Sequence, residues 1–249
     1  MSSQPPPPSP PASPPDGWQH VVTLAAGLAH EIKNPLSTIN LNLQLLQEDW
    51  QNADSPKEKR TLKRLQTLQR ETSRLAGLLE DFLRYARTQS IEPQACQLND
   101  LIGEILDLVA PQAAQQHVEV RTRLAPDLPP IQADPKLLKQ ALLNLVINAE
   151  QAMPEGGELL VETSPGDHHV QVDVTDTGRG IPDHHRAKIF DVYFSTKKEG
   201  SGLGLPTAQR ILHLHGGSLD LESEVGKGTR FTARIPIEPP HGDREEQRP

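Results

Sequence analysis

The sequence predicts an α+β fold in which a hairpin of two long helices precedes an α/β sandwich. In the first part of the chain, apolar residues recur at steps of three and four, the period of an amphipathic helix. After residue 97, short segments that alternate like strands are mixed with shorter helical patterns. Only 3% of the 249 residues are aromatic, so we expect leucine, isoleucine, valine and alanine to fill the core.

Changes in composition divide the chain into four regions. Residues 1–17 are rich in proline and serine, which predicts a disordered, polyproline-like leader that acts as a tether and not as an SH3-type ligand. Residues 18–92 form the helical hairpin, residues 93–238 form the sandwich, and residues 239–249 are a polar, flexible tail.

The first predicted helix runs from Trp18 to about Trp50. Proline at position 35 lacks a backbone donor and presses on the carbonyl of Glu31, which predicts a kink or a loosened turn. The apolar stripe of this helix consists of Leu24, Leu28, Ile32, Leu36, Ile39, Leu43 and Leu46.

The second predicted helix follows a turn, with Ser55 as N-cap and Pro56 at the first helical position, and it ends near Arg87. Two helices with opposed stripes cannot cover each other on all sides. We therefore expect a homodimer that forms a four-helix bundle. The apolar seam of this helix has heptad spacing and consists of Leu65, Leu68, Thr72, Leu75, Leu79, Phe82 and Ala86.

The sandwich region predicts three helices and five strands. The helix at 134–153 has Asp134 as its N-cap. The other helices are expected at 98–116 and 206–215, and the strands at 118–124, 158–163, 170–175, 218–222 and 230–235.

Four short polar or glycine-rich patterns lie in this region, and each alone is a weak signal because most such glycines form turns. Two asparagines four residues apart project from one helix face, and amide oxygens suit Mg2+. The alternative is a solvated helix face. The patterns are Asn144-x3-Asn148, Asp176-Thr-Gly178-Arg-Gly180, Gly200-Ser-Gly202-Leu-Gly204 and Gly226-Lys-Gly228-Thr229.

The side chain of Asp176 ends an apolar strand and offers only acceptors when ionised, so it favours the amino group of adenine over the carbonyl of guanine. Gly178 and Gly180 allow the backbone to approach the ring. Glycines 200–204 precede a helix whose first N–H groups and dipole suit phosphates. Lys197 belongs to a predicted lid and can reach the phosphates, whereas an ordinary surface loop is the alternative.

Together the four patterns resemble the N box and glycine boxes of the Bergerat-type ATPase fold of histidine kinases, gyrase, Hsp90 and MutL, over residues 137–236. The Walker pattern is absent. The resemblance implies the following roles for an ATP and Mg2+ site: Asn148 holds the metal, Asn144 assists it, Asp176 holds the adenine amino group, Lys197 and the amides of the trio Gly200, Gly202 and Gly204 meet the phosphates, and Thr229 lies at the adenine end.

The first helix carries the motif His30-Glu31-Ile32-Lys33-Asn34-Pro35-Leu36. His30 and Asn34 are one turn apart, and the apolar stripe through Ile32 predicts that His30 points away from it. A neutral imidazole is a competent nucleophile near pH 7, and Glu31 can hold the proton of its other nitrogen. Asn34 can position a water molecule.

This motif resembles the H box of two-component sensor histidine kinases, most closely the nitrogen-regulator branch, and extends the resemblance to residues 18–236. The family implies ATP-dependent phosphorylation of His30, transfer to an aspartate of a response regulator, and phosphatase action through Asn34. Two alternatives stay open: an ATPase that drives a conformational clamp, and a catalytically idle scaffold that binds a regulator.

Bulk properties limit the other partners. The net charge is −8 with no basic block, which argues against nucleic acid. No apolar stretch reaches the roughly 18 residues of a membrane span, so we expect no membrane insertion. The start of the chain does not resemble a signal peptide, and the lone Cys96 suits a reducing compartment. We therefore expect a cytoplasmic protein.

Overall fold

The computed structural model describes residues 17–50, 55–87, 90–197 and 200–238. The chain divides into two compact units, residues 1–87 and residues 88–249, which are described separately below. Residues 1–16 of the expected leader, and the whole expected tail, lie outside the described residues. The exact limits of the four regions stay a prediction.

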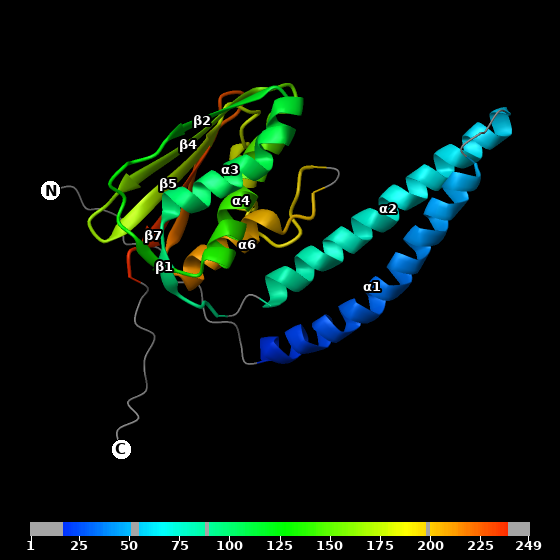
Figure 1. Cartoon of the computed structure of the whole chain (residues 1–249), viewed down its shortest axis with the longest axis horizontal. Coiled ribbons are helices and arrows are strands. Elements are labelled where there is room, and N and C mark those ends of the chain that lie inside the picture. The colour runs from blue at the N-terminus through cyan, green and yellow to red at the C-terminus, as the bar shows by residue number, and fades with distance from the viewer. Residues whose placement is uncertain (1–16, 51–54, 88–89, 198–199, 239–249) are drawn as a thin grey trace, which may run out of the picture. The chain divides into compact units, whose positions relative to one another are not determined.

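The first unit is a hairpin of two helices, α1 (Gly17–Asp49) and α2 (Pro56–Arg87), as the sequence predicted (Figure 1). The start of α2 is a reciprocal capping box. The hydroxyl of Ser55 accepts from the Glu58 amide at 3.2 Å, and the Glu58 carboxylate accepts from the Ser55 amide at 3.0 Å. Pro56 occupies the first helical position, where its missing N–H costs nothing.

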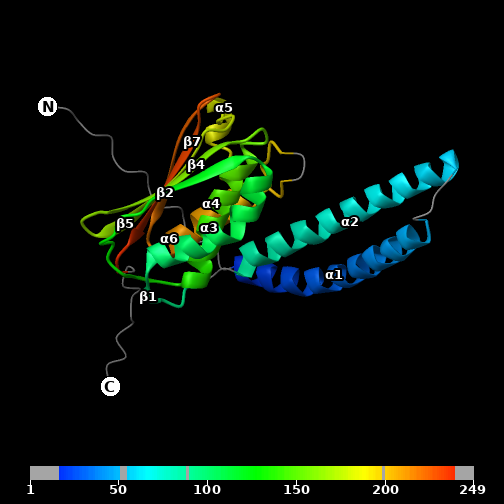
Figure 2. The ribbon, with the colours of Figure 1, turned by 45° about the horizontal axis from the view of Figure 1, so that its top comes forward.

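The helix α1 continues through Pro35 without a break, and its curvature is visible in Figures 1 and 2. Next to the proline, the hydroxyls of Ser37 and Thr38 donate to the carbonyls of Lys33 and Asn34, at 2.9 and 3.2 Å. Bonds of this kind are common where a helix bends. The proline therefore does not end α1, and a loosened turn at this position stays a prediction.

The two helices are joined by polar contacts more than by a core. Lys33 forms an ion pair with Glu80 at 2.5 Å, and Asn40 donates to Ser73 at 3.2 Å. Among the described side chains of the hairpin, those of Leu43 and Thr72 are buried.

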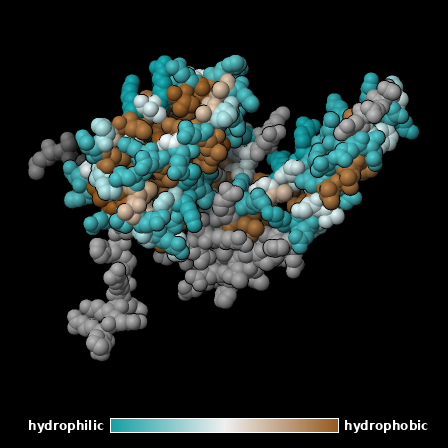
Figure 3. Space-filling model, viewed as in Figure 1, coloured by the Kyte–Doolittle hydropathy of each residue, from teal (hydrophilic) through white to brown (hydrophobic). Residues whose placement is uncertain are grey.

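Much of the predicted apolar stripe is exposed within one chain. Ile32 is 47% exposed, and Leu68 and Leu75 are each 54% exposed. Ile32 is therefore not buried within the single hairpin, and its burial in the expected four-helix bundle stays a prediction. Figure 3 shows hydrophobic side chains on the surface of the hairpin.

The second unit is a two-layer α/β sandwich, as predicted. Its five-stranded sheet has the order β2-β4-β5-β7-β6, in which only the pairing of β2 with β4 is parallel. Figures 1 and 2 show α3, α4 and α6 on one face of this sheet. The elements are α3 (Leu98–Gln115), β2 (Val118–Arg123), α4 (Pro135–Gln151), β4 (Gly157–Pro165), β5 (His169–Asp176), α6 (Gly204–Leu214), β6 (Ser218–Glu224) and β7 (Gly228–Pro236).

Three short elements were not predicted. The strands β1 (Gln94–Cys96) and β3 (Ile131–Ala133) pair antiparallel as a separate small sheet, and α5 (Asp183–Arg186) is a single helical turn. Elements of three or four residues are too short to show a period in the sequence.

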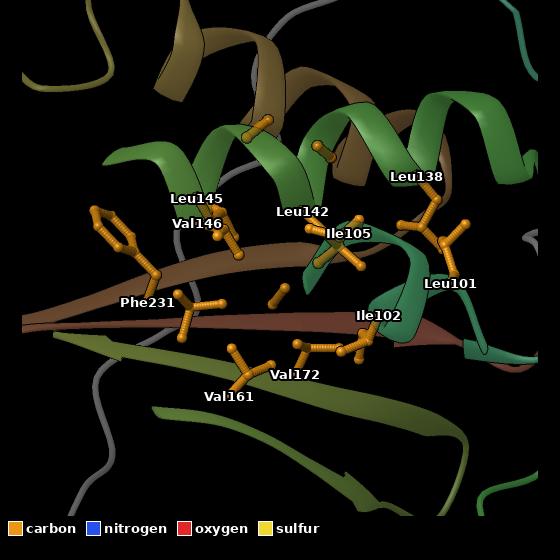
Figure 4. Packing of buried hydrophobic residues seen from close by; sticks show 14 of the residues in the cluster. Leu101, Ile102, Ile105, Leu138, Leu142, Leu145, Val146, Val161, Val172 and Phe231 are labelled. Carbon is orange, nitrogen blue, oxygen red and sulfur yellow. The ribbon is translucent and has the colours of Figure 1, made fainter. Parts of the chain in front are cut away.

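The core of the second unit lies between the sheet and the helices (Figure 4). Val161 and Val172 point from the sheet toward Ile105 of α3 and Leu142 of α4, with Phe231 at one end of the cluster. Most of the buried residues are leucine, isoleucine, valine and alanine, which confirms the expected composition.

The strand β5 leads directly from this core to the candidate site. Its alternate residues Val170, Val172, Val174 and Asp176 are all buried, so the last position of an apolar row is a carboxylate. Among the described residues, no helix has the length and hydropathy that a bilayer crossing requires.

Candidate functional site

The helix α4 carries the two predicted asparagines on its half-buried side. Asp134 caps its start, as predicted, by accepting from the amides of Lys136 and Leu137 at 3.1 Å each. The side chain of Asn144 donates to the carbonyl of Gly204 at 3.1 Å. Asn144 therefore joins α4 to the start of α6, and the alternative of a solvated helix face does not hold for it.

The carboxylate of Asp176 is a buried acceptor with one unused oxygen. The side chain is 2% exposed, and its Oδ1 accepts from the Gly178 amide at 2.8 Å. Oδ2 is buried and has no hydrogen-bond partner among the described residues. Burial raises the pKa of Asp176, although the backbone amides of Gly178 and Thr229 and the nearby Lys197 ammonium oppose this. A buried oxygen of this kind needs a donor, and an adenine amino group supplies one.

Thr229 lies opposite Asp176 in the register of β5 and β7, and it is buried. Its hydroxyl lies 3.0 Å from the hydroxyl of Ser223, which accepts from the Ile181 amide at 2.8 Å. The structure thus brings Thr229 to the end of the site where adenine is expected. Ser223 was missed, because a single serine in a strand carries no signal in the sequence.

The glycines after Asp176 are required by contacts within the protein. A Cβ atom at Gly178 would lie 2.5 Å from the carbonyl oxygen of Ala152, at the end of α4. A Cβ atom at Gly180 would overlap the carbonyl of Glu224. Packing of this turn thus explains both glycines, and their approach to a nucleotide ring stays a prediction.

The glycine trio forms the approach to α6, which begins two residues earlier than predicted, at Gly204. A Cβ atom at Gly200 would lie 2.5 Å from the Ser195 hydroxyl, and one at Gly202 would lie 2.6 Å from the carbonyl carbon of Tyr193. Among the residues that the structure describes, no side chain caps the start of α6, where Leu203 is the N-cap residue. The first N–H groups of α6 therefore lack a side-chain acceptor, which fits a phosphate group.

Lys197 lies against the last turn of α4. Its Nζ donates to Asn148 Oδ1 at 2.8 Å and to Gln151 Oε1 at 2.9 Å, and the side chain is half-buried. Burial, and after it the positive charge of Arg179, lowers the pKa of Lys197 to about 8. The alternative of an ordinary surface loop is thus wrong for Lys197. Gln151 and Arg179 were not predicted, because their part in the site depends on contacts with a segment distant in the sequence.

The phosphate-acceptor motif lies in α1. His30 and Glu31 are helical, and Asn34 follows His30 by one turn. The side chain of Asn34 is exposed. The side chains of His30 and Glu31 lie outside the described part of the chain, so the predicted outward direction of His30 stays a prediction.

The structure therefore brings together every predicted nucleotide-binding residue within the second unit, while the acceptor motif belongs to the first. Among the described residues, no group of three or more His, Cys, Asp or Glu side chains could hold a metal ion. The candidate metal ligands are the amide oxygens of Asn148 and Asn144, which are hard neutral donors that suit Mg2+.

Two protein families match the two units. The family described as histidine kinase-, DNA gyrase B- and HSP90-like ATPase matches residues 133–239, and the His Kinase A (phospho-acceptor) domain matches residues 21–91. The sensor histidine kinase ZraS of Escherichia coli K12 is 39% identical over 214 residues, which are 86% of this chain and 45% of ZraS. This chain thus spans less than half of that relative.

Solved structures are similar as well. Full-length ShkA in complex with AMPPNP has a TM-score of 0.70 at 28% identity, over 86% of this chain and 46% of ShkA. ThkA in complex with the response regulator TrrA has a TM-score of 0.63 at 28% identity, over 87% of this chain and 62% of ThkA. The catalytic domain of ThkA is 32% identical with a TM-score of 0.56, over 59% of this chain and 97% of that domain. Membership of the nitrogen-regulator branch stays a prediction.

Proposed function

The chain belongs to the family of two-component sensor histidine kinases, and we propose that it moves the γ-phosphate of ATP to His30 and then to an aspartate of a response regulator. The observation that carries the proposal is the buried Oδ2 atom of Asp176 at the end of the apolar row of β5, an acceptor without a hydrogen-bond partner in the described part of the chain. It supports a purine site in the same chain as a phosphate-acceptor domain.

Asp176 and its surroundings are proposed to select ATP. Its unpaired oxygen accepts from the amino group of adenine, and an oxygen at the same place in guanine would be repelled. Thr229 borders this end of the site. At the other end, the uncapped start of α6 and the Lys197 ammonium supply positive charge for the phosphates. The complex of the similar protein ShkA with AMPPNP supports this assignment.

Asn148, with help from Asn144, is proposed to hold Mg2+, which neutralises charge on the phosphates when it is bound. The role of Asn144 is also mechanical, since its donation to Gly204 holds the start of α6 beside α4. The metal ligands and the phosphate-binding amides are therefore positioned by the same contact.

His30 is proposed to attack the γ-phosphorus with a neutral ring nitrogen. A nitrogen–phosphorus bond forms, the bond from the γ-phosphorus to its bridging oxygen breaks, and ADP leaves with that electron pair. Glu31 accepts or holds the proton of the other ring nitrogen, which keeps the attacking nitrogen unprotonated. Phosphoryl transfer depends mainly on alignment and charge stabilisation, so this division of tasks between two units is sufficient.

The second substrate is proposed to be a response regulator. An aspartate of the regulator takes the phosphoryl group from His30. Asn34 orients a water molecule that hydrolyses the aspartyl-phosphate of the regulator in the phosphatase reaction. Support comes from the exposed side chain of Asn34 one turn after His30, and from the solved complex of the similar ThkA with its regulator TrrA. Both ATP and response regulators are cytoplasmic, so the proposal places the two described units in the cytoplasm.

A homodimer is proposed because both the apolar stripe of α1 and the apolar seam of α2 contain residues that one chain leaves exposed. Ile32 of α1, and Leu68 and Leu75 of α2, are each about half exposed within one chain. A second hairpin that presents the same seam would bury them in a four-helix bundle.

Incubation of the full chain with γ-labelled ATP and Mg2+ tests the proposal. The expected product is a labelled protein whose phosphate survives alkali and is lost in acid, as a phosphohistidine requires. The variant His30→Gln should take no label, and His20→Gln, on the same helix, should be labelled normally. A clamp ATPase would release labelled phosphate without labelling the protein, and an idle scaffold would do neither; either result contradicts the proposal.

A further inference from the structure

The head group of Lys197 is surrounded by oxygen atoms of the last turn of α4. Its Nζ donates to Asn148 Oδ1 at 2.8 Å, to Gln151 Oε1 at 2.9 Å and to the Asn148 carbonyl at 3.4 Å. All three partners are neutral oxygens. The Lys197 ammonium thus joins the lid segment, residues 190–197, to α4.

Neutral oxygens at these positions are also what a hard divalent cation requires. Asn148 Oδ1 is the atom that the proposed function assigns to Mg2+. Lys197 therefore occupies the same acceptor oxygen that the proposed metal site requires. A divalent cation and an ammonium group on one amide oxygen would lie within a few ångströms of each other and would repel.

Positive charge around the lid strengthens this conflict. Arg179 donates to Thr196, the neighbour of Lys197, at 3.4 Å, and its positive charge acts on the Lys197 ammonium more strongly than the opposing charge of the Asp176 carboxylate. A third cationic group added to this cluster, without phosphates to balance it, would be repelled by both side chains. Entry of a metal–nucleotide complex instead brings anionic oxygens to which the lysine can move.

We propose that Lys197 and Mg2+ bind alternately to Asn148 Oδ1, and that Gln151 is the positioning residue that holds the lysine there before the metal arrives. Docked lysine keeps the lid against α4. Arrival of the metal with its nucleotide displaces the ammonium, which then becomes available to the phosphates. This inference rests on the proposed function for the identity of the ligand, and it adds a role for Gln151 and a competition that sets the apparent affinity.

The competition predicts the sign of a mutational effect. Every protein molecule with a docked lysine has to release it before the nucleotide complex binds, so docking lowers the apparent affinity. Replacement of Gln151 with methionine keeps the length of the side chain and removes one acceptor for the ammonium. Loss of one hydrogen bond to a charged group should tighten the binding of Mg2+–ADP by about tenfold.

The test compares the full-length wild type with Gln151→Met and with the control Gln140→Met, which alters the same helix away from the lid. Calorimetry measures the affinity for ADP with Mg2+. Hydrogen exchange follows the lid amides of Tyr193 and Phe194, which donate to the carbonyls of Gly202 and Asp191, respectively. We expect Gln151→Met to bind Mg2+–ADP more tightly and to exchange these amides several-fold faster without nucleotide, while Gln140→Met resembles the wild type.

Weaker or unchanged affinity of Gln151→Met, or unchanged exchange of the lid amides, would overturn the inference and leave the proposed function intact. A nucleotide-binding role for Gln151 would produce the weaker affinity, and a role in the fold alone would leave the affinity unchanged. Failure of the wild type to bind Mg2+–ADP at all would overturn both.

Discussion

The helical hairpin and the sandwich unit differ in how far their apolar side chains are buried. In the sandwich, residues such as Leu142, Leu145 and Phe231 are almost completely buried between the sheet and its helices. In the hairpin, Leu68 and Leu75 remain half exposed, and polar contacts such as Lys33–Glu80 join the two helices.

The difference shows that a single chain buries the core of the sandwich but leaves apolar residues of the hairpin exposed. The sandwich closes a core and assembles all of the predicted nucleotide-binding residues by itself. The hairpin presents an acceptor motif on a scaffold whose apolar seam needs another surface. Changes in the sandwich should therefore act within one chain, whereas changes in the seam should act through assembly.

The largest effect is expected from Asn148→Asp. The new carboxylate would replace the neutral Oδ1 that now accepts from Lys197 at 2.8 Å, and it would form an ion pair that retains the lysine while placing negative charge beside the phosphates. Labelling from ATP should fall by at least about 100-fold, since even indirect changes at metal sites cost tenfold or more. The control Gln140→Glu adds the same charge to the same helix and should keep its labelling. Labelling of Asn148→Asp at the wild-type rate would refute Asn148 as the metal ligand.

The next effect concerns the stability of the sandwich alone. Gly228 has φ +111°, and a Cβ atom there would overlap the carbonyl of Asp176. Gly228→Ala should lower the free energy of unfolding by at least about 3 kcal/mol, from strain and overlap together.

The matched control lies in the same turn. Gly226 has φ +79° but nothing within 4 Å of a Cβ atom, so Gly226→Ala should cost only about 1–2 kcal/mol of strain. Chemical denaturation followed by circular dichroism measures both variants. Equal losses in the two would show that overlap with Asp176 does not matter.

Substitution of the hairpin seam should act on assembly. Leu68→Glu combined with Leu75→Glu removes two apolar side chains that are expected to be buried between chains. At about 1.5 kcal/mol or more for each leucine, association should weaken by about 100-fold or more. Sedimentation at several protein concentrations measures this. Gln66→Glu, which is exposed on the same helix, is the control, and unchanged association of the double variant would contradict the four-helix bundle.

The smallest effect is expected at the capping box. Ser55→Ala removes the acceptor for the Glu58 amide and should cost about 1 kcal/mol of hairpin stability. Thr67→Ala is the control, because the Thr67 hydroxyl bonds only inside α2, where it donates to the Lys63 carbonyl and accepts from the Arg70 guanidinium, and it caps no helix end. Thermal unfolding that ranks the two variants in the opposite order would show that the box contributes nothing.

The sequence predicted those parts of the fold that local physics decides. The period of apolar residues located α1, α2, α3 and α4, and the capping residues Ser55 and Asp134 marked the starts of two of them. The small sheet of β1 and β3 was missed, because three residues show no alternation and the pairing joins distant segments. The stripe through Ile32 was recognised, but a stripe on one helix does not reveal which surface covers it, and in the single hairpin Ile32 is about half exposed.

The residues of the candidate site were likewise predicted only in part. Asn148 and Asp176 were recognised because they belong to short patterns with fixed spacing. Gln151 and Ser223 were not, since each has a partner far away in the chain: Lys197 for Gln151 and Ile181 for Ser223. Recognition of such residues requires the contacts of the folded chain.

The most direct test of the two-unit account measures nucleotide binding and phosphate labelling on the same proteins. His30→Gln should bind Mg2+–AMPPNP as tightly as the wild type and take no label from ATP. Asp176→Asn, which replaces the unpaired acceptor with an amide, should lose both binding and label. An Asp176→Asn protein that binds the nucleotide normally, or a His30→Gln protein that still becomes labelled, would contradict the account.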